Sequence, residues 1–282
     1  IAREVSVWAR LDNKNVLPFL GVRPQDDWES LWLVSPWMEN GDIKTYLSAN
    51  PNADRLSLAS GVTSGVAYLH QNNIAHGDLK ANNILVDSEG QPRLADFGLS
   101  LVLDDVLPEQ TTSTMFAGSV RWMAPERIQP KRFGLEPSNS RTLPGDVFSL
   151  AMTLYEIFTL TLPYHELTQM DVPRAIVTGD RPPHPGPEAV QRGLHEDMWK
   201  FMQLCWSENP EHRPDLAKLS DDSDDQKSDS GETEEGDFRL SEIRSATVQT
   251  IERNIALDMP TNDPRPPVEA SVGKRYPTEV CS

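Results

Sequence analysis

The sequence contains few cysteines and no long apolar run. Only Cys205 and Cys281 occur among its 282 residues, so it offers neither a disulfide framework nor a cysteine-based zinc site. No apolar segment reaches the roughly 18 residues that a membrane-spanning helix needs, and no signal-peptide pattern is visible. We therefore expect a reducing, cytoplasmic location and no membrane partner.

A basic stripe is also absent. The chain carries 26 Lys and Arg against 43 Asp and Glu, a formal net charge of -17. Binding to nucleic acid depends on clustered Lys and Arg that contact phosphates, so this function class is excluded. Apolar residues make up 38% of the chain, below the usual share of roughly 45–50%, which indicates a polar segment outside the core.

That polar segment lies at the C-terminal end. Residues 220–282 carry 15 acidic and 7 basic side chains, a net charge of -8, and residues 221–237 alone contain nine acidic residues and one Lys. Such a segment buries too little apolar surface to offset its ordering entropy, so we expect disorder there. Within this tail, one face of an isolated helix is predicted from Leu240, Ile243, Thr247, Ile251 and Ile255. A domain boundary is therefore expected after residue 219.

The hydrophobic pattern of residues 1–219 predicts a mostly helical unit with a few short strands. Helices are expected at residues 1–11, 43–47, 53–71, 146–160, 171–177 and 196–206. Short strands are expected at 19–22, 31–35, 84–86 and 93–95, and a turn at 87–90 should join the last two into a hairpin.

Three short motifs stand in one order along this unit. They are residues 76–83 (His-Gly-Asp-Leu-Lys-Ala-Asn-Asn), 96–98 (Asp-Phe-Gly) and 124–126 (Ala-Pro-Glu). Each motif alone is weak, but chance does not explain their order and separations, with an apolar hairpin between the first two. From about residue 4 to residue 219, the sequence resembles the eukaryotic protein kinases.

The resemblance implies an α+β, protein-kinase-like fold. Residues 1–36 match part of the small lobe (N-lobe), namely its helix and two strands, and residues 37–219 match the mostly helical large lobe (C-lobe). A disordered tail over residues 220–282 completes the expected organisation.

The resemblance also implies a phosphoryl-transfer site, a reaction that depends on positioning and charge neutralisation. Asp78 is expected to accept the proton of a substrate hydroxyl, and Lys80 to reach the γ-phosphate. Asn83 and Asp96 offer the oxygen ligands that Mg²⁺ prefers, and complete the catalytic set. ATP and Mg²⁺ are the expected cofactors. The implied nucleotide contacts are Ser35, Trp37, Met38, Asp42, Leu85, Asn83 and Asp96.

Several matched positions have structural roles in the family. Glu126 should form a buried ion pair with Arg213. Asp146 matches the residue that hydrogen-bonds the backbone of the catalytic loop, and it could also serve as a helix N-cap. A stacked hydrophobic column of the family matches Trp8, Phe19, His76 and Phe97.

Two features indicate which hydroxyl is phosphorylated. Lys80 is typical of Ser/Thr kinases, and residues 118–126 (Gly-Ser-Val-Arg-Trp-Met-Ala-Pro-Glu) resemble the substrate loop of the tyrosine-kinase-like group, most of which act on Ser/Thr. Gly77 departs from the family, which usually has an Arg there that grips a phosphate on the activation loop. We therefore expect less dependence on phosphorylation of that loop.

The largest departure is an absence. No Gly-x-Gly-x-x-Gly loop and no Val-Ala-x-Lys strand precedes Glu4, and these elements cover and orient the phosphates. We expect an N-terminally truncated kinase that is inactive as given, with the missing strands encoded upstream. A pseudokinase or scaffold that binds proteins through the C-lobe is the alternative. The tail could bind a partner or act only as a solvated linker. The protein substrate and the oligomeric state stay open.

Overall fold

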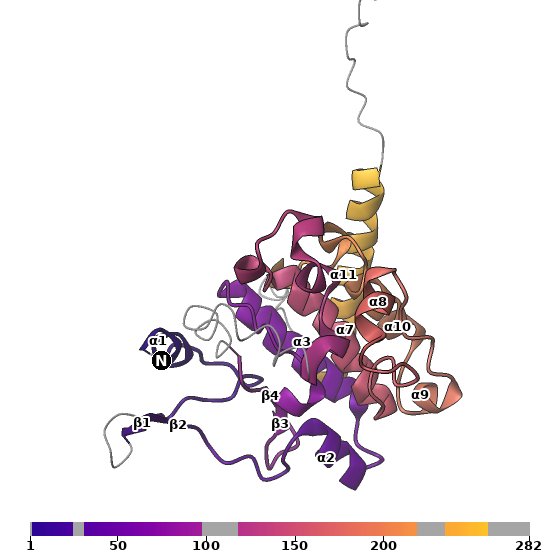
Figure 1. Ribbon diagram of the computed structural model, residues 1–282. Helices are drawn as coiled ribbons and strands as arrows, with labels where there is room; N and C mark the ends of the chain where they lie inside the picture. The colour runs from indigo at the N-terminus through magenta and orange to yellow at the C-terminus, as the bar shows by residue number, and fades with distance from the viewer. Residues whose placement is uncertain (1, 25–30, 98–117, 219–234, 259–282) are drawn as a thin grey trace, which may run out of the picture.

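In the computed structural model, residues 2–24, 31–97, 118–218 and 235–258 are described. Gly98, the segment between Asp96-Phe97 and the substrate loop, and most of the acidic segment expected to be disordered lie outside the described residues. The helices form one body, and a small two-stranded sheet with a short helix stands beside it (Figure 1). The α+β organisation, with a mostly helical large lobe and a remnant small lobe, is confirmed.

The predicted elements occur in the predicted order with shifted ends, and two short helices, at 125–128 and 187–191, were not predicted. The first half of the chain contains α1 (Ala2–Trp8), β1 (Gly21–Pro24), β2 (Leu31–Val34), α2 (Ile43–Ala49), α3 (Arg55–Gln71), β3 (Ile84–Val86) and β4 (Pro92–Leu94). The second half contains α6 (Pro125–Ile128), α7 (Leu143–Thr159), α8 (Val172–Val177), α9 (Pro187–Gln191), α10 (Glu196–Cys205) and α11 (Glu235–Asp258).

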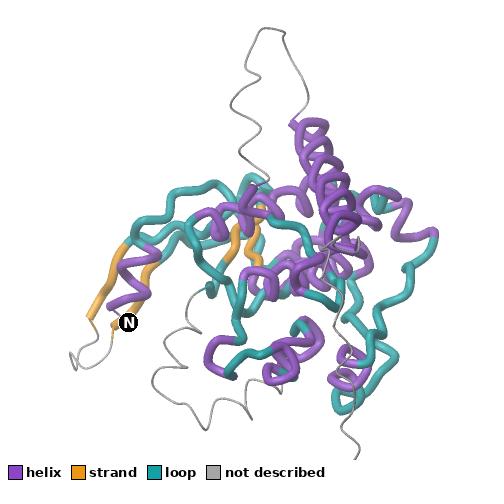
Figure 2. Tube along the Cα trace, turned by 90° about the horizontal axis from the view of Figure 1, so that it is seen from above, coloured by secondary structure: helices purple, strands orange, loops and turns teal. Residues whose placement is uncertain are grey.

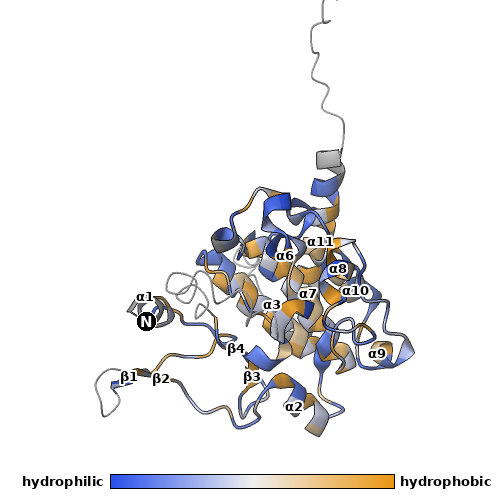
Figure 3. Ribbon diagram, in the orientation of Figure 1, coloured by the Kyte–Doolittle hydropathy of each residue, from blue (hydrophilic) through white to orange (hydrophobic). Residues whose placement is uncertain are grey.

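Helix α7 forms the centre of the large lobe. Every residue from position 146 to position 158 is buried, which agrees with the apolar colouring of this helix in Figure 3. The helix begins three residues before the predicted start, because the side chain of Thr142 caps it by accepting a hydrogen bond from Gly145 N at 3.0 Å. The prediction that Asp146 is the N-cap is therefore wrong.

Helix α3 packs closely against the β3–β4 hairpin. Its N-terminus is capped by Asp54, whose carboxylate accepts hydrogen bonds from Leu56 N and Ser57 N, each at 3.0 Å. A Cβ atom at Gly65 would lie 2.7 Å from the carbonyl oxygen of Asn15, so only glycine permits this approach. The same carbonyl accepts a hydrogen bond from Leu94 N at 2.8 Å. Through this contact, the N-terminal segment is joined to the hairpin that carries Asp96.

The small-lobe remnant is a two-stranded antiparallel sheet. β1 and β2 pair with Gly21 opposite Val34 and Pro24 opposite Leu31, and they lie to the side of the helical body together with α1 (Figure 2). Several of their side chains face solvent, including Trp32, which is 60% exposed. The predicted strands are present, and most of their apolar side chains stay exposed.

Helix α11 differs from its prediction as an isolated helix. It packs against α3 and α10, and its buried face consists of Ile243, Ala246, Thr247 and Thr250. Ile251, which was assigned to the apolar face, is 42% exposed. Ile243 and Thr247 were predicted on this face, whereas Ala246 and Thr250 were not. The Thr247 hydroxyl is compatible with burial because its Oγ1 donates a hydrogen bond to Ile243 O at 2.7 Å within the helix.

Two hydrogen bonds and an ion pair fix α11 to the lobe. Arg244 Nε lies 2.7 Å from Asp197 Oδ2, near the start of α10. Asn254 Nδ2 donates to the carbonyl oxygen of His212 at 2.9 Å, and Arg253 donates to that of Arg213 at 2.5 Å. These contacts attach part of the predicted tail to the kinase-like unit, and the domain boundary at residue 219 stays a prediction.

The packing of α11 predicts unequal effects of two matched substitutions. Ile243→Ala should lower the free energy of unfolding by about 2–4 kcal/mol, because it leaves a cavity against the large lobe. Ile251→Ala, on the exposed face of the same helix, should change it by less than about 0.5 kcal/mol. Urea unfolding of both variants measures the difference. Equal, small effects would contradict the packing of α11.

Candidate active site

The catalytic loop brings together three of the four predicted catalytic side chains. The Asp78 carboxylate oxygen Oδ2 accepts hydrogen bonds from Lys80 Nζ at 2.7 Å and from Asn83 Nδ2 at 3.1 Å. Asn83 Nδ2 also donates to Asp78 O at 2.8 Å. A 3₁₀ turn at Ala81–Asn83, just before β3, places Asn83 back over Asp78. The loop thus folds around one partly exposed carboxylate.

Asp78 is held as a carboxylate. Burial on its own raises the pKa of this group, but hydrogen bonds and the positive charge of Lys80, together with the bond from Asn83, outweigh burial and lower the pKa below its ordinary value. The side chain keeps 28% of its surface exposed. It is therefore ionised at neutral pH and accessible to a hydroxyl that could donate a hydrogen bond to it.

Asp96 lies at the end of the hairpin beside the same loop. The backbone of Ala95 donates to Asn83 O at 2.9 Å, so the strand that leads to Asp96 is fixed to the catalytic loop. Asp96 is exposed and has φ of +58°, a left-handed conformation that is uncommon outside glycine and that often marks functional sites. No hydrogen bond or ion pair between Asp96 and Asp78, Lys80 or Asn83 is observed.

The residues present fit a Mg²⁺ ion by their chemistry. Asn83 bonds Asp78 through its amide nitrogen, which turns its amide oxygen away from Asp78. The exposed Asp96 offers a carboxylate. Magnesium usually takes one or two such protein oxygens and completes its shell with water and phosphates. No cluster of three His, Cys, Asp or Glu side chains that could hold a metal occurs within the described ranges.

The four residues of the predicted hydrophobic column contact one another in the order Phe19, Trp8, Phe97 and His76. The Trp8 ring lies 5.1 Å from the Phe19 ring and 5.8 Å from the Phe97 ring, and His76 lies 6.2 Å from Phe97. Trp8 Nε1 also donates to Leu17 O at 2.7 Å. The prediction is confirmed, and the column connects α1 to the residue after Asp96.

Asp146 anchors the start of the catalytic loop, as predicted. Its Oδ2 accepts from His76 N at 2.6 Å and its Oδ1 from Gly77 N at 2.9 Å. His70 Nε2 on α3 lies 3.2 Å from Oδ2. Because Asp146 belongs to the central helix α7, the backbone just before Asp78 is fixed to a buried part of the core.

His76 predicts a pH dependence of stability. Burial lowers its pKa, against the opposing influence of Asp146, Asp78 and Asp96. The folded state therefore binds the proton more weakly than the unfolded state, and the free energy of unfolding should fall as the pH drops below about 6.5, by up to ~1.4 kcal/mol per pH unit. His76→Phe keeps a ring in the column and removes this proton.

The test compares urea unfolding at about pH 7 and 5.5, above the range in which most carboxylates titrate. The loss of stability on acidification should be smaller in His76→Phe than in the natural chain. The matched control is His165→Gln, whose side chain is 49% exposed and which should keep the natural dependence. An unchanged pH dependence in His76→Phe would show that protonation of His76 does not contribute to the loss of stability on acidification.

The predicted buried ion pair is confirmed. Arg213 Nη1 lies 2.6 Å from Glu126 Oε1, Nη2 lies 2.9 Å from Oε2, and both side chains are 0% exposed. The guanidinium also donates to Pro144 O at 2.8 Å and to Ser207 O at 2.9 Å. This bidentate ion pair fixes the position of α6. It therefore also fixes the last residues of the substrate loop, which lead into α6.

Glu156 was missed by sequence reasoning. It lies on α7 and is 0% exposed, and its Oε2 accepts from Ala81 N at 3.1 Å and from Trp122 Nε1 at 2.7 Å. Lys44 Nζ lies 3.4 Å from Oε1. Burial raises the pKa of this carboxyl, and the bond from Ala81 and the charge of Lys44 oppose the rise. A lone Glu in an otherwise apolar helix was the available signal, since a buried carboxyl needs partners.

The predicted nucleotide contacts are only partly assembled. Met38 is buried with Leu17 and Ala95, and Leu85 packs against this group. Trp37 is 84% exposed, and Ser35 is half-buried with its hydroxyl 3.4 Å from Pro36 O. The Asp42 side chain caps α2 by accepting from Lys44 N and Thr45 N. Met38 and Leu85 thus offer an apolar surface near Asn83 and Asp96. The Asp42 carboxylate, in contrast, is already used to cap the N-terminus of α2.

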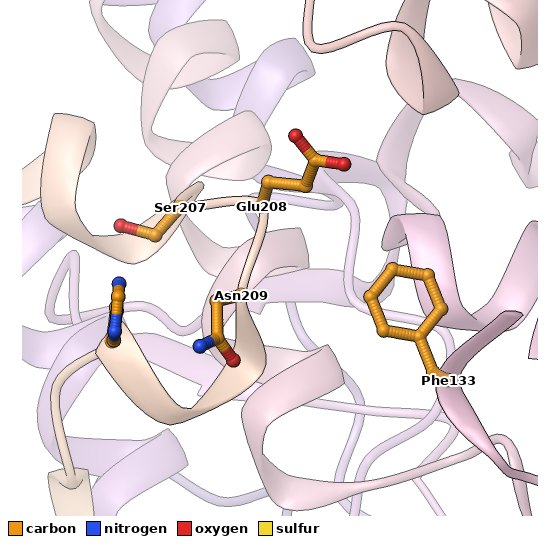
Figure 4. Close-up of a pocket in the computed structure, with 5 residues that line it drawn as sticks. Phe133, Ser207, Glu208 and Asn209 are labelled. Carbon is orange, nitrogen blue, oxygen red and sulfur yellow. The ribbon is translucent and has the colours of Figure 1, made fainter. Parts of the chain in front are cut away.

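A surface pocket of about 600 Å³ lies elsewhere on the large lobe (Figure 4). It is lined by Phe133, Ser207, Glu208, Asn209 and His212. None of the predicted site residues lines it, and Glu208 is engaged by Arg132 at its edge.

Three features together define the protein kinase class. They are the ionised Asp78 held by Lys80 and Asn83, the exposed Asp96 at the end of the adjoining hairpin, and a helical lobe that fixes the catalytic loop through Asp146. The family model "Protein tyrosine and serine/threonine kinase" matches residues 1–222. The chain belongs to this family of eukaryotic protein kinases.

Individual relatives agree with the family. The chain is 33% identical over 223 residues to serine/threonine-protein kinase STY17 of Arabidopsis thaliana, covering 77% of this chain and 36% of that protein. It is 30% identical over 222 residues to serine/threonine/tyrosine-protein kinase HT1 of the same plant, covering 77% and 52%. It is also 30% identical over 230 residues to tyrosine-protein kinase SPK-1 of Girardia tigrina, covering 78% and 44%. The chain therefore spans about a third to a half of these relatives.

In the part of the chain that the structure describes, no helix has both the length and the apolar character needed to cross a bilayer.

Proposed function

We propose that this protein transfers the γ-phosphoryl group of ATP to Ser or Thr hydroxyls of protein substrates in signalling. The observation that carries the proposal is the Asp78 carboxylate, ionised, partly exposed and held by Lys80 and Asn83. A general base must be within hydrogen-bond reach of the proton that it accepts, and this partly exposed carboxylate offers such reach to a hydroxyl.

The side chains divide the work of the reaction. Asp78 orients the substrate hydroxyl and accepts its proton as the new P–O bond to the hydroxyl oxygen forms. The bond between the γ-phosphorus and the β,γ-bridging oxygen of ATP breaks in the same transfer, and ADP leaves. Lys80 lies against Asp78 Oδ2 and Ser119 Oγ, where its charge offsets negative charge that develops on the transferred group. Asn83 and Asp96 would hold Mg²⁺ through oxygen atoms. ATP supplies the phosphoryl group, and a bound Mg²⁺ would partly neutralise the negative charge of the phosphates.

The choice of Ser/Thr rests on Lys80 and on the substrate loop of tyrosine-kinase-like type. The named relatives include serine/threonine, dual and tyrosine kinases, so their names support the family more than the acceptor. Incubation with γ-labelled ATP, Mg²⁺ and peptides that differ only in Ser, Thr or Tyr tests the proposal. Label on Ser and Thr is expected, and label on Tyr alone would overturn this specificity.

The 282 residues contain no Gly-x-Gly-x-x-Gly loop and no Val-Ala-x-Lys strand, and we propose that this stretch alone transfers phosphate very slowly or not at all. The exposed apolar side chains of Leu20 and Trp32, 64% and 60% exposed, mark the sheet face on which further strands could pack. Activity assays should therefore use the full-length protein, with any residues that the natural chain carries before Ile1.

A protein-binding pseudokinase is the second candidate, favoured by the exposed Trp37 and Trp32. The two candidates differ in their use of Asp78. A scaffold should bind its partners equally well after Asp78→Asn, whereas a kinase should lose its phosphorylated products.

A further inference from the structure

Gly77 lies directly before Asp78 and has no side chain with which to hold the loop. Its φ of +77° lies in the left-handed region that favours glycine. Its N–H donates to Asp146 Oδ1 at 2.9 Å. Its carbonyl oxygen accepts a hydrogen bond from Arg127 Nη1, a residue of α6. Both backbone polar groups of Gly77 are therefore held by charged side chains from two other helices.

Arg127 is well placed to act as a fixed donor. It follows Glu126, whose carboxylate is locked by Arg213 in the buried ion pair, and its own N–H donates to Ala124 O at 3.0 Å. Its side chain is half-buried. A guanidinium stays charged at all relevant pH values and presents its donors in a rigid plane, and charge-assisted hydrogen bonds are stronger than neutral ones.

Two further contacts connect the same segment to the catalytic loop. Ser119 Oγ accepts from Lys80 Nζ at 2.9 Å, and Trp122 Nε1 shares Glu156 Oε2 with Ala81 N. Residues 119–127 thus reach the loop at positions 77, 80 and 81, on both sides of Asp78. Of these contacts, the one from Arg127 reaches the residue adjacent to Asp78.

We propose that Arg127 is a positioning residue for Asp78. Asp146 accepts a hydrogen bond from the N–H of Gly77, and Arg127 donates one to its carbonyl oxygen. The contact from Arg127 thereby sets the orientation of the peptide unit between Gly77 and Asp78, from which the Asp78 side chain projects. The catalytic consequence rests on the proposed function. Since Gly77 has no side chain, the contact holds the backbone before Asp78 through the carbonyl oxygen alone, with the cation supplied by α6.

Amide hydrogen exchange in the 282-residue chain tests the contact without any assay of activity. In Arg127→Met, exchange at Gly77 and Asp78 should become about tenfold faster, since one charge-assisted hydrogen bond is lost. Amides in the middle of α7 should keep their natural rates. The matched control, Arg132→Met, removes an exposed Arg of the next turn that pairs with Glu208, and should leave residues 76–81 unchanged.

Arg127→Lys keeps the charge but lacks the fork of donors, and should accelerate exchange at Gly77 and Asp78 by about threefold. It decides the matter should Arg127→Met fail to fold. Natural exchange rates at these two amides in a folded Arg127→Met or Arg127→Lys chain would overturn the proposal.

Kinetics of the full-length protein separate positioning from substrate binding. In Arg127→Met, kcat should fall about tenfold while the KM for ATP stays within about twofold, and Arg127→Lys should recover part of kcat. Exchange that responds in a protein without kinase activity would support the contact and refute the proposed function. An active protein in which Arg127→Met changes neither exchange nor kcat would refute the contact alone.

Discussion

Asp78→Asn in the full-length protein will lower kcat for phosphate transfer by roughly 10²–10⁴-fold, the range typical of a lost general base. Asn has nearly the same shape and can still accept a hydrogen bond from Lys80 Nζ, now 2.7 Å from Asp78 Oδ2, but it cannot take the proton of the substrate hydroxyl. Because nucleotide contacts are left in place, the KM for ATP should change little.

The measurement is steady-state transfer from γ-labelled ATP at saturating peptide, with thermal unfolding to confirm that the variant folds. Asp197→Asn serves as the control, since Asp197 on α10 forms an exposed ion pair with Arg244 on α11. The kcat of this variant should match that of the natural protein. If folded Asp78→Asn keeps more than about a tenth of the natural kcat, Asp78 does not act as the base.

Arg213→Met will have the largest effect on stability. It leaves the Glu126 carboxylate, 0% exposed, without its partner, and removing one member of a buried pair typically costs about 3–5 kcal/mol. For a chain of this size, we expect Tm to fall by on the order of 10 °C.

Two comparisons make this result specific to the buried pair. The double variant Glu126→Leu/Arg213→Met removes both charges and should be more stable than Arg213→Met alone. Arg132→Met breaks the exposed pair with Glu208 and should cost less than about 1 kcal/mol. Equal losses in Arg213→Met and Arg132→Met would show that the buried pair contributes no more than a surface contact.

The local geometry of the catalytic loop could be predicted from its motif because the residues that bond Asp78 belong to the same motif. Lys80 and Asn83 both bond Asp78 from within six residues of one loop. The hairpin that leads to Asp96 was predicted from two short apolar strands and the turn between them. Asp146, Arg213 and the ring column were also predicted, through their resemblance to the family, although they lie far away in sequence.

Contacts that depend on a single side chain in a distant element could not be predicted. Glu156 meets Ala81 and Trp122 only after α7 has packed beneath both loops. Arg127 reaches Gly77 across 50 residues, and its sequence neighbours give no sign of this partner. Helix α11 was predicted, but its packing was not, because its buried face includes Ala246 and Thr250, which the apolar pattern did not mark.

The central claim is a metal-nucleotide site built from Asn83 and Asp96 beside Asp78, and paramagnetic broadening tests it most directly. Mn²⁺ is added, in place of Mg²⁺, to the full-length protein with a non-hydrolysable ATP analogue, and amide NMR signals are followed. Those of Asp78, Asn83 and Asp96 should broaden first, and Asp96→Asn should suppress the effect. Broadening that spares these three residues, or that is centred on other acidic residues, would contradict the site.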